Sequence, residues 1–309
     1  LRTCPPENEG IAMDTGPPGT FDDGFTGYRG QIIEDAGAYR LWYESRSVET
    51  LQGQGPSDYT PVGYAESSDG IEWKKPTLGR FPWKGSTTNN IILPDYGYCF
   101  CDAFPAAADE RYKYLSLANH YLGKDDPLRN TLFYYTSPDG IDWSFRPKNV
   151  LPMRPDAVNQ VVYDPRYESY IAYIRCWPLS GCRGDAYGRA VARLDLGADP
   201  MRPWPVVENP NPYRPWGPDL HPAPSTEYPV VMTYPGLGSE GHHTDLYDPN
   251  VLIYPWADDV YLAFPELNRE LPDSPLELHS RVEIGFCVSR DGIEWRWPSL
   301  DPYIPLGEA

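Results

Sequence analysis

The chain has 309 residues, including 36 prolines and 27 glycines, and it carries a formal net charge of −18. Proline at more than twice its usual share of about 5% argues against long helices, and no apolar run approaches the roughly 20 residues that cross a bilayer. Without such a run we expect no membrane partner. The negative charge would repel a phosphate backbone, so we also expect no nucleic-acid partner, whereas neutral sugars, cations and basic partners are compatible. Burial of the 24 tyrosines and 10 tryptophans favours a folded, soluble globule.

Short predicted strands follow one another in four groups, with turn signals between them. The groups span residues 20–80, 88–150, 155–205 and 245–300, and a proline-rich connector covers residues 203–235. The predicted strands are 28–33, 39–44 and 62–65; 98–104, 112–118 and 131–135; 159–163, 170–175 and 188–194; and 250–254, 261–264 and 282–288. Residues 1–20 and 299–309 would supply at most part of a fifth group.

One phrase occurs three times, at Ser68–Trp73, Ser137–Trp143 and Ser289–Trp295. Each copy contains Ser, Asp-Gly-Ile, an acid and Trp, and we call it the Asp-Gly phrase. Asp-Gly is a turn dipeptide because Asp bonds to its own backbone and Gly accepts a positive φ. The following Ile and Trp, at alternate positions, predict a strand whose buried face begins at once.

A tyrosine opens an apolar stretch before each copy of the phrase. Tyr39, Tyr112 and Tyr261 precede the Asp of the phrase by 30, 27 and 30 residues. Tyr170 opens a fourth stretch, which is followed only by a degenerate version of the phrase at Asp195–Trp204. Such repetition of about four strands is typical of a β-propeller, whose blades are four-stranded sheets. We therefore predict an all-β chain, a single β-propeller domain over residues 1–309, with five blades of which one is incomplete. Four blades are the alternative.

Polar residues at or just before the first strand of each group, with at least one carboxylate in every group, are the candidate site residues, since inner strands line the funnel of a propeller. Turns also favour Asp, so a structural role is the alternative for any one of them. Five residues beyond the four tyrosines lie three charged residues and a leucine, which either belong to the site or reach solvent at strand ends. The two sets are Asp22, Asp23, Arg29, Asp102, Asp156, His242, His243, Asp245 and Asp248, and Glu44, Leu117, Arg175 and Glu266.

The layout resembles the five-bladed propeller glycosidases of the invertase, levansucrase, arabinanase and xylosidase group. The matching segments are Tyr39–Glu44, Asn89–Ile92, Asp102, Glu110–Lys113 and Asp156–Pro165. The Asp-Gly phrase is also similar to the sialidase Asp box, a structural turn outside the site, and on that ground we exclude Asp69, Asp139 and Asp291 from the site. The resemblance implies a glycoside hydrolase that acts on a poly- or oligosaccharide through paired carboxylates.

Carried over by position, the resemblance implies catalytic and substrate-binding roles. Asp22 or Asp23 would be the base, Asp102 or Asp156 the supporting acid, and Glu266 or Asp245 the proton donor. The predicted catalytic residues are Asp23, Asp102, Asp156, Asp245 and Glu266, and the predicted substrate-binding residues are Arg29, Glu44, Arg111, Arg175 and His243.

Two other functions fit the same sequence. A non-catalytic carbohydrate-binding propeller would bind glycans without turnover, and a glycoside phosphorylase would need a basic phosphate pocket. We predict no metal site and no required cofactor, with a structural calcium ion as an option, and a location outside the cytoplasm, extracellular or periplasmic. Cys176 and Cys182 flank a turn and either form a disulfide or stay as thiols.

Overall fold

The computed structural model describes residues 4, 6–7, 10–54, 60–117, 119–123, 126, 128–151, 155, 159–176, 189–204, 230–235, 244–270 and 280–306. They divide into two compact units, an N-terminal unit (Asn8–Val150) and a C-terminal unit (Leu151–Ala309 with Leu1–Glu7). Within the described residues no helix is long and apolar enough to cross a membrane. The predicted residues Asp156, His242 and His243, as well as Cys182, lie outside the described residues.

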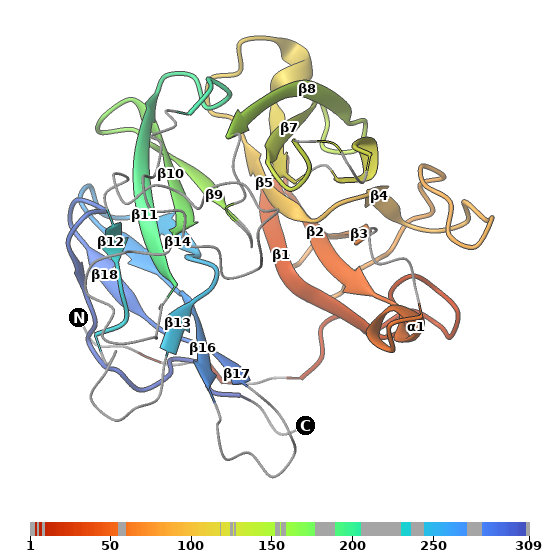
Figure 1. Cartoon of the computed structure of the whole chain (residues 1–309), viewed down its shortest axis with the longest axis horizontal. Coiled ribbons are helices and arrows are strands. Elements are labelled where there is room, and N and C mark those ends of the chain that lie inside the picture. Colours follow the sequence, from red (N-terminus) through yellow and green to blue (C-terminus); the bar gives the residue numbers. More distant parts are fainter. Residues whose placement is uncertain are drawn as a thin grey trace. The chain divides into compact units, whose positions relative to one another are not determined.

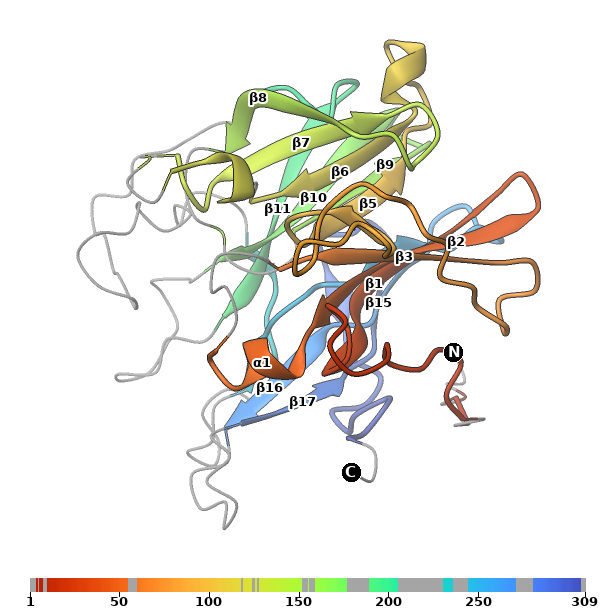
Figure 2. The ribbon, with the colours of Figure 1, turned by 90° about the vertical axis from the view of Figure 1, so that its right-hand side faces the viewer.

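The N-terminal unit contains two four-stranded antiparallel sheets, each with its strands in chain order (Figure 1). The first sheet consists of β1 (Phe25–Asp35), β2 (Ala38–Arg46), β3 (Val62–Ser67) and β4 (Ile91–Leu93). The second consists of β5 (Gly97–Cys101), β6 (Tyr112–Ser116), β7 (Leu132–Ser137) and β8 (Ser144–Leu151), which Figure 2 shows from another side. The short helix α1 (Val48–Leu51) and the 3-10 turns Ala108–Glu110 and Asn119–Tyr121 connect strands. This order of strands is that of a propeller blade.

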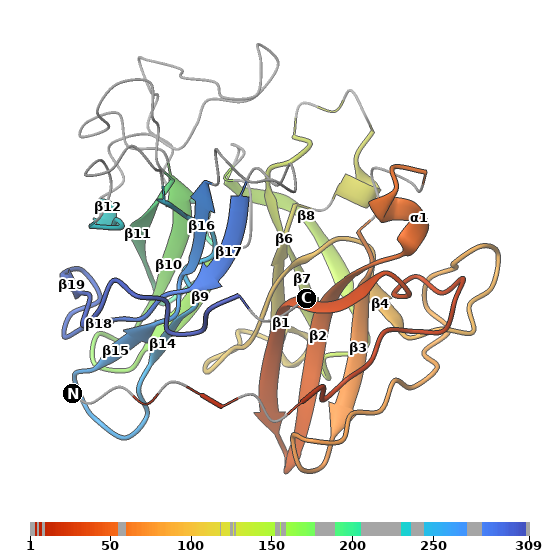
Figure 3. The ribbon, with the colours of Figure 1, turned by 90° about the horizontal axis from the view of Figure 1, so that it is seen from below.

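The C-terminal unit contains two four-stranded sheets and a three-stranded one, all antiparallel. One sheet consists of β9 (Gln160–Asp164), β10 (Ser169–Cys176), β11 (Ala190–Gly197) and β12 (Val230–Met232). The next consists of β14 (Val251–Ile253), β15 (Tyr261–Ala263), β18 (Cys287–Ser289) and β19 (Trp295–Arg296). The three-stranded sheet consists of β13 (Thr244–Leu246), β16 (Glu266–Glu270) and β17 (Ser280–Ile284), with β16 and β17 side by side in Figure 3. Because β15 leads into β16 and β17 into β18, the three-stranded sheet prolongs the second one.

Large aromatic side chains fill the space between sheets in each unit. In the N-terminal unit Trp42, Tyr64, Tyr114 and Tyr135 belong to one buried cluster that joins the two sheets. Burial of their hydrophobic area holds these short strands together, because a sheet of short strands needs a buried hydrophobic face to be stable in water. The predicted burial of the aromatic residues is confirmed at these positions.

All three copies of the Asp-Gly phrase form the same turn. Gly70, Gly140 and Gly292 have φ values of +76°, +77° and +71°, which favour glycine. In each copy the Asp Oδ1 accepts hydrogen bonds from the two N–H groups that follow the glycine, and a serine Oγ accepts from the Asp and Gly N–H groups. In the first copy that serine is Ser67, so every copy has a spacer residue before the Asp. The phrase is therefore a self-contained turn motif.

The isoleucine of the phrase belongs to the turn rather than to a strand. Ile71 is 71% exposed and Ile293 is 49% exposed, so the prediction that a buried face begins there is wrong for these two copies, whereas Ile141 packs partly buried against the N-terminal cluster. Because the Asp carboxylate binds the Ile N–H group, that group cannot join a ladder, and β8 and β19 begin only after it. The Trp indole instead donates to the Gly carbonyl in two copies, at 3.2 Å for Trp73 and 3.0 Å for Trp143.

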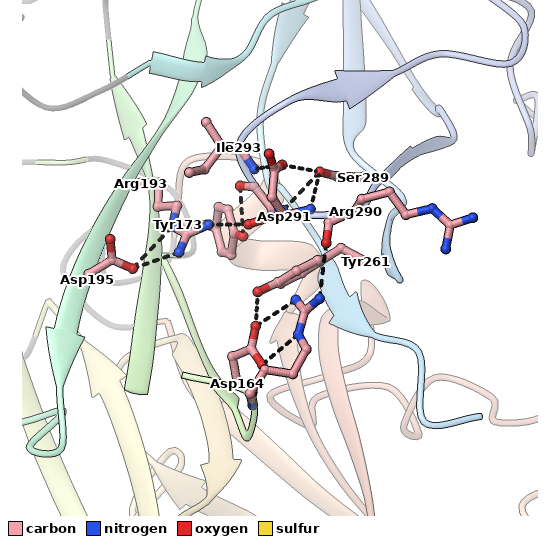
Figure 4. Close-up of polar contacts among 11 residues, drawn as sticks. Asp164, Tyr173, Arg193, Asp195, Tyr261, Ser289, Arg290, Asp291 and Ile293 are labelled. Carbon is pink, nitrogen blue, oxygen red and sulfur yellow. Dashed lines mark hydrogen bonds and ion pairs between the residues drawn. The ribbon is translucent and has the colours of Figure 1, made fainter. Parts of the chain in front are cut away.

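Two copies of the phrase also join neighbouring sheets. In the N-terminal unit the Trp42 indole on β2 donates to the Gly140 carbonyl at 3.1 Å. In the C-terminal unit the Tyr173 hydroxyl donates to the Gly292 carbonyl at 3.1 Å and the Arg193 guanidinium to the Asp291 carbonyl at 2.6 Å (Figure 4). The repeat thus marks sheet-to-sheet contacts, which agrees with a structural role for its carboxylates.

Candidate functional site

Each sheet has two ends that differ in the residues they present. We call the end at which the first strand begins the leading end, and the end at which that strand turns into the second the turn end. In the first sheet Phe25 pairs with Arg46 at the leading end and Asp35 pairs with Ala38 at the turn end. Figure 3 shows α1 beyond the leading end of β1 and β2.

An arginine and a glutamate lie together at the leading end of the first sheet. Glu44 is 2% exposed, and its carboxylate lies 3.6 Å from Arg29 and 3.1 Å from Arg46. The register of β1 shifts between Tyr28 and Gln31, and Arg29 has a φ of +53°, a conformation that costs energy in a non-glycine residue. This bulge accompanies the approach of the Arg29 guanidinium to Glu44 and, at 5.6 Å from the ring centre, to Tyr96.

Asp95 lies at the leading end of the second sheet and directly precedes Tyr96, whose ring the Arg29 guanidinium approaches. It is 5% exposed and its carboxylate accepts a hydrogen bond from the His120 N–H at 2.8 Å. Burial raises the pKa of Asp95 to about 6, although the His120 hydrogen bond and the charge of Arg129 act in the opposite direction. Burial also raises the pKa of Tyr114 well above its usual value, with smaller contributions from the charges of Glu44 and Asp95, so both carboxyl groups act on one phenol.

Sequence reasoning missed Asp95, although a signal was present. Asp95 stands two residues before Gly97, where β5 begins, just as Asp23 stands two residues before Phe25, where β1 begins. The residue predicted for this sheet, Asp102, follows β5 and therefore lies at the turn end. The interpretation that Asp102 stands at or before its first strand is thus wrong, since consecutive antiparallel strands reverse direction there.

A second group of charged side chains lies in the C-terminal unit. The Arg175 and Arg189 guanidinium groups lie 4.2 and 4.8 Å from the centre of the Tyr247 ring. Arg175, which is 1% exposed, has its guanidinium 3.9 Å from the carboxylate of Asp248. Arg189 forms an ion pair with Asp245, and its N–H donates to the same carboxylate at 2.8 Å. Cation–π contact and ion pairing together fix both arginines.

Glu266 joins this group through the backbone. The Tyr247 N–H donates to the Glu266 carbonyl at 2.9 Å and the Glu266 N–H to the Asp248 carbonyl at 3.0 Å. Glu266 is 6% exposed. The structure therefore brings together four candidate residues, Arg175, Asp245, Asp248 and Glu266, and adds Arg189 to them.

The four positions five residues beyond the tyrosines are all buried. Glu44 and Arg175 are 2% and 1% exposed, Leu117 and Glu266 are each 6% exposed, and none of them reaches solvent as a strand-end group would. The spacing from the tyrosine therefore identified charged residues at or beside the leading ends in both units.

Three other predicted residues make structural contacts. Asp23 accepts hydrogen bonds from the N–H groups of Gly19 at 2.6 Å and of Val48 at 2.8 Å, and the latter bond lies at the start of α1. Asp102 forms a buried ion pair with Lys113, which is 1% exposed. Arg111 pairs with Asp35 at 2.5 Å at the turn end. These contacts account for the three residues structurally, and their predicted roles in a site stay predictions.

The described residues contain no candidate metal site. Within the part of the chain that the structure describes, no group of three or more His, Cys, Asp or Glu side chains could hold a metal ion. The optional structural calcium stays a prediction.

The fold has counterparts among solved structures, although no protein-family model and no curated protein matches the sequence. A glycoside hydrolase is 13% identical and matches 92% of this chain and 76% of its own, with a TM-score of 0.51. A glycosyl hydrolase from Bacteroides ovatus is 13% identical over 85% of this chain and 69% of its own, with a TM-score of 0.43. An α-L-arabinanase from Penicillium chrysogenum, complexed with arabinobiose, is 13% identical over 91% and 67%, with a TM-score of 0.45.

The fold class follows from the sheets and from the first of these likenesses. The chain is all-β and has the β-propeller fold, as its repeats predicted. Fold does not determine activity, because functions are carried by sites. The number of blades stays a prediction.

Proposed function

We propose that the protein is a glycoside hydrolase that cleaves a poly- or oligosaccharide between paired carboxyl groups at the leading ends of its sheets. Hydrolysis of a glycosidic bond needs one protonated carboxyl group as acid and one ionised carboxylate as base or nucleophile. Two carboxyl groups whose surroundings differ in this sense are the signature of such a pair.

The contrast between Asp95 and Glu44 carries the proposal. Asp95 is buried, and burial outweighs the opposing charge of Arg129, so its pKa of about 6 keeps a proton available near neutral pH, as the acid requires. Glu44 forms ion pairs with Arg29 and Arg46, which suit it to the ionised role. We assign Asp95 the acid role and Glu44 the base role within the N-terminal unit.

The C-terminal group supplies further candidates. Asp245 and Glu266 keep the catalytic roles predicted for them, and Asp248 joins them. Arg175 and Arg189 are suited to hold sugar hydroxyl groups, because each guanidinium presents several N–H donors in a fixed plane.

Single substitutions test the assignment. Glu44→Gln, Asp95→Asn, Asp245→Asn and Glu266→Gln keep side-chain size and remove the carboxylate, and Asp259→Asn, which is exposed, is the matched control. The assay measures release of reducing ends from a panel of neutral polysaccharides, with and without inorganic phosphate. Removal of an acid or base group lowers kcat about 10²- to 10⁴-fold, and Asp259→Asn should leave it unchanged.

Each alternative outcome is recognisable. Cleavage that depends on phosphate and releases a sugar phosphate would identify a phosphorylase. Glycan binding without turnover by the wild-type protein would identify a binding module. If each of the four variants hydrolyses glycan at the wild-type rate, the assigned carboxyl groups are not the catalytic ones.

A further inference from the structure

A cavity of about 420 Å³ lies in the N-terminal unit, outside the two groups of charged residues. One wall is the segment Gly16–Asp22 and the other belongs to the connection between β3 and β4, from Lys75 to Asn90. Its volume falls within the roughly 300–1,000 Å³ typical of small-molecule sites. Glu44 and Asp95 are not among its lining residues, so it is a second site.

Hydrogen bonds across the cavity hold its walls in place. The Trp83 indole donates to the Gly19 carbonyl at 3.0 Å, and the Lys75 ammonium donates to the Asp14 carbonyl at 2.8 Å. A Cβ at Gly16 would collide with the Asp22 carboxylate, so a larger residue there would force the Asp22 side chain to move. A site that is already formed before binding avoids the cost of ordering its walls.

The charges in the cavity are already paired. Asp22, which is 2% exposed, lies 2.7 Å from the Lys75 ammonium and accepts a hydrogen bond from the Tyr43 hydroxyl at 3.2 Å. The Lys84 ammonium lies 2.7 Å from the Glu49 carboxylate. Because both lysines are neutralised by carboxylates and the whole chain has a charge of −18, an anionic ligand gains little here. The ligand that fits is neutral.

Hydroxyl groups and two aromatic side chains, Trp83 and the buried Phe21, make up much of the remaining lining. Thr77, Ser86 and Thr88 each bring a hydroxyl that can donate and accept, and Trp83 brings an indole ring. The Thr20 hydroxyl donates to the Pro17 carbonyl at 2.7 Å and can still accept. A neutral carbohydrate matches this combination, since its hydroxyl groups exchange hydrogen bonds with such side chains and its C–H faces pack on an aromatic ring. From this we infer that the cavity is a carbohydrate-binding site for a neutral sugar, separate from the carboxyl groups assigned to catalysis.

A spectroscopic test can observe this site alone. The chain has 10 tryptophans, so ¹⁵N labelling of tryptophan gives a small set of indole signals, and Trp83→Phe assigns the one from the cavity. The probes are neutral disaccharides of xylose, arabinose, mannose and glucose, with digalacturonate as the charged comparison. We expect at least one neutral disaccharide to shift the Trp83 signal saturably, and digalacturonate to shift it less.

Two variants complete the test. Thr77→Trp places a bulky side chain in the cavity and should weaken the effect at least tenfold, while the other indole signals show that the fold is retained. Trp256→Ala, which removes a tryptophan that is 81% exposed, should leave binding unchanged. Binding unaffected by Thr77→Trp, the absence of any shift by a neutral disaccharide, or a stronger effect of digalacturonate would each overturn the inference.

The result is independent of catalysis. Glu44→Gln should lower kcat about 10²- to 10⁴-fold under the proposed function and leave the Trp83 titration as in the wild type. If the wild-type protein cleaves no glycan but the Trp83 signal still shifts, the proposed function is refuted and the sugar site is supported. If the protein cleaves a glycan but the Trp83 signal does not shift, the sugar site is refuted and the proposed function is supported.

Discussion

The Tyr112 hydroxyl on β6 donates a hydrogen bond to the Asp35 carboxylate at the end of β1, on the neighbouring sheet. The same contact occurs in the C-terminal unit, where the Tyr261 hydroxyl on β15 donates to Asp164 at the end of β9 (Figure 4). In both units, therefore, a repeated tyrosine at the start of the second strand of one sheet is hydrogen-bonded to the end of the first strand of the sheet before it. This contact accounts for the tyrosine at positions 112 and 261.

Removal of either hydroxyl should lower stability. Hydrogen bonds to charged groups contribute about 1.5–3 kcal/mol, and Asp35 keeps its Arg111 partner, so we expect Tyr112→Phe to cost about 1.5 kcal/mol of the free energy of unfolding. Tyr261→Phe should have a similar effect. Tyr167→Phe, at a residue that is 58% exposed, is the control. Urea unfolding measures all three, and equal stability of Tyr112→Phe and the control would refute the role of this contact.

Asp95 should make the protein less stable as the pH rises from about 4 to 7. Its folded pKa of about 6 exceeds the ordinary value of 3.8, so the folded state binds this proton more tightly than the unfolded state. The stabilisation is complete below pH 3.8 and is lost as the pH passes 6, and it corresponds to about 3 kcal/mol.

Asp95→Asn tests this dependence directly. The amide cannot titrate, but its oxygen still accepts the His120 hydrogen bond, so the free energy of unfolding should change less with pH over this interval. Asp35, whose pKa is lowered to about 2 mainly by its hydrogen bond with Arg111, loses its stabilising contribution only below pH 4 and does not interfere. Parallel pH profiles for the variant and the wild type would show that Asp95 does not titrate as described.

The glycines of the Asp-Gly phrase should differ in their tolerance of alanine. All three have a positive φ, which costs a non-glycine residue about 1–2 kcal/mol. A Cβ at Gly140 would lie 2.8 Å from the Trp42 ring, whereas one at Gly70 would lie 3.7 Å from the Tyr39 ring. Gly140→Ala should therefore cost about 1–3 kcal/mol more than Gly70→Ala, measured by thermal or urea unfolding. Similar losses for the two variants would mean that packing on Trp42 is not limiting.

The buried ion pair of Asp248 should matter more than an exposed one. Asp248→Asn leaves Arg175, which is 1% exposed, without this carboxylate, and loss of one partner of a buried pair costs about 3–5 kcal/mol. Asp259→Asn removes the same group from an exposed pair with Arg290, where the expected cost is about 0–1 kcal/mol. Calorimetry measures the loss of stability in both variants. A small loss of stability in Asp248→Asn would show that other groups hold Arg175.

The sequence predicted several of the residues in the candidate site, but it did not predict which of them lie together in the structure. The spacing from the tyrosines identified Glu44, Arg175 and Glu266, because a strand pattern fixes how far along the strand a residue lies. It did not distinguish Asp95 from Asp102, which stand before and after the same strand and lie at opposite ends of the sheet. The strand prediction for that segment ran from 98 to 104, so it included Asp102 within the strand.

The sequence by itself determined the all-β fold, the repeated blade and the Asp-Gly turn, since these depend on contacts between residues close along the chain. The tertiary structure decided which charged side chains meet. The approach of Arg29 to Glu44 accompanies a bulge in β1, the raised pKa of Asp95 depends on burial within its sheet, and the cavity beside Asp22 needs two segments that are distant in sequence. Each of these depends on packing between distant parts of the chain, which local patterns of residues do not encode.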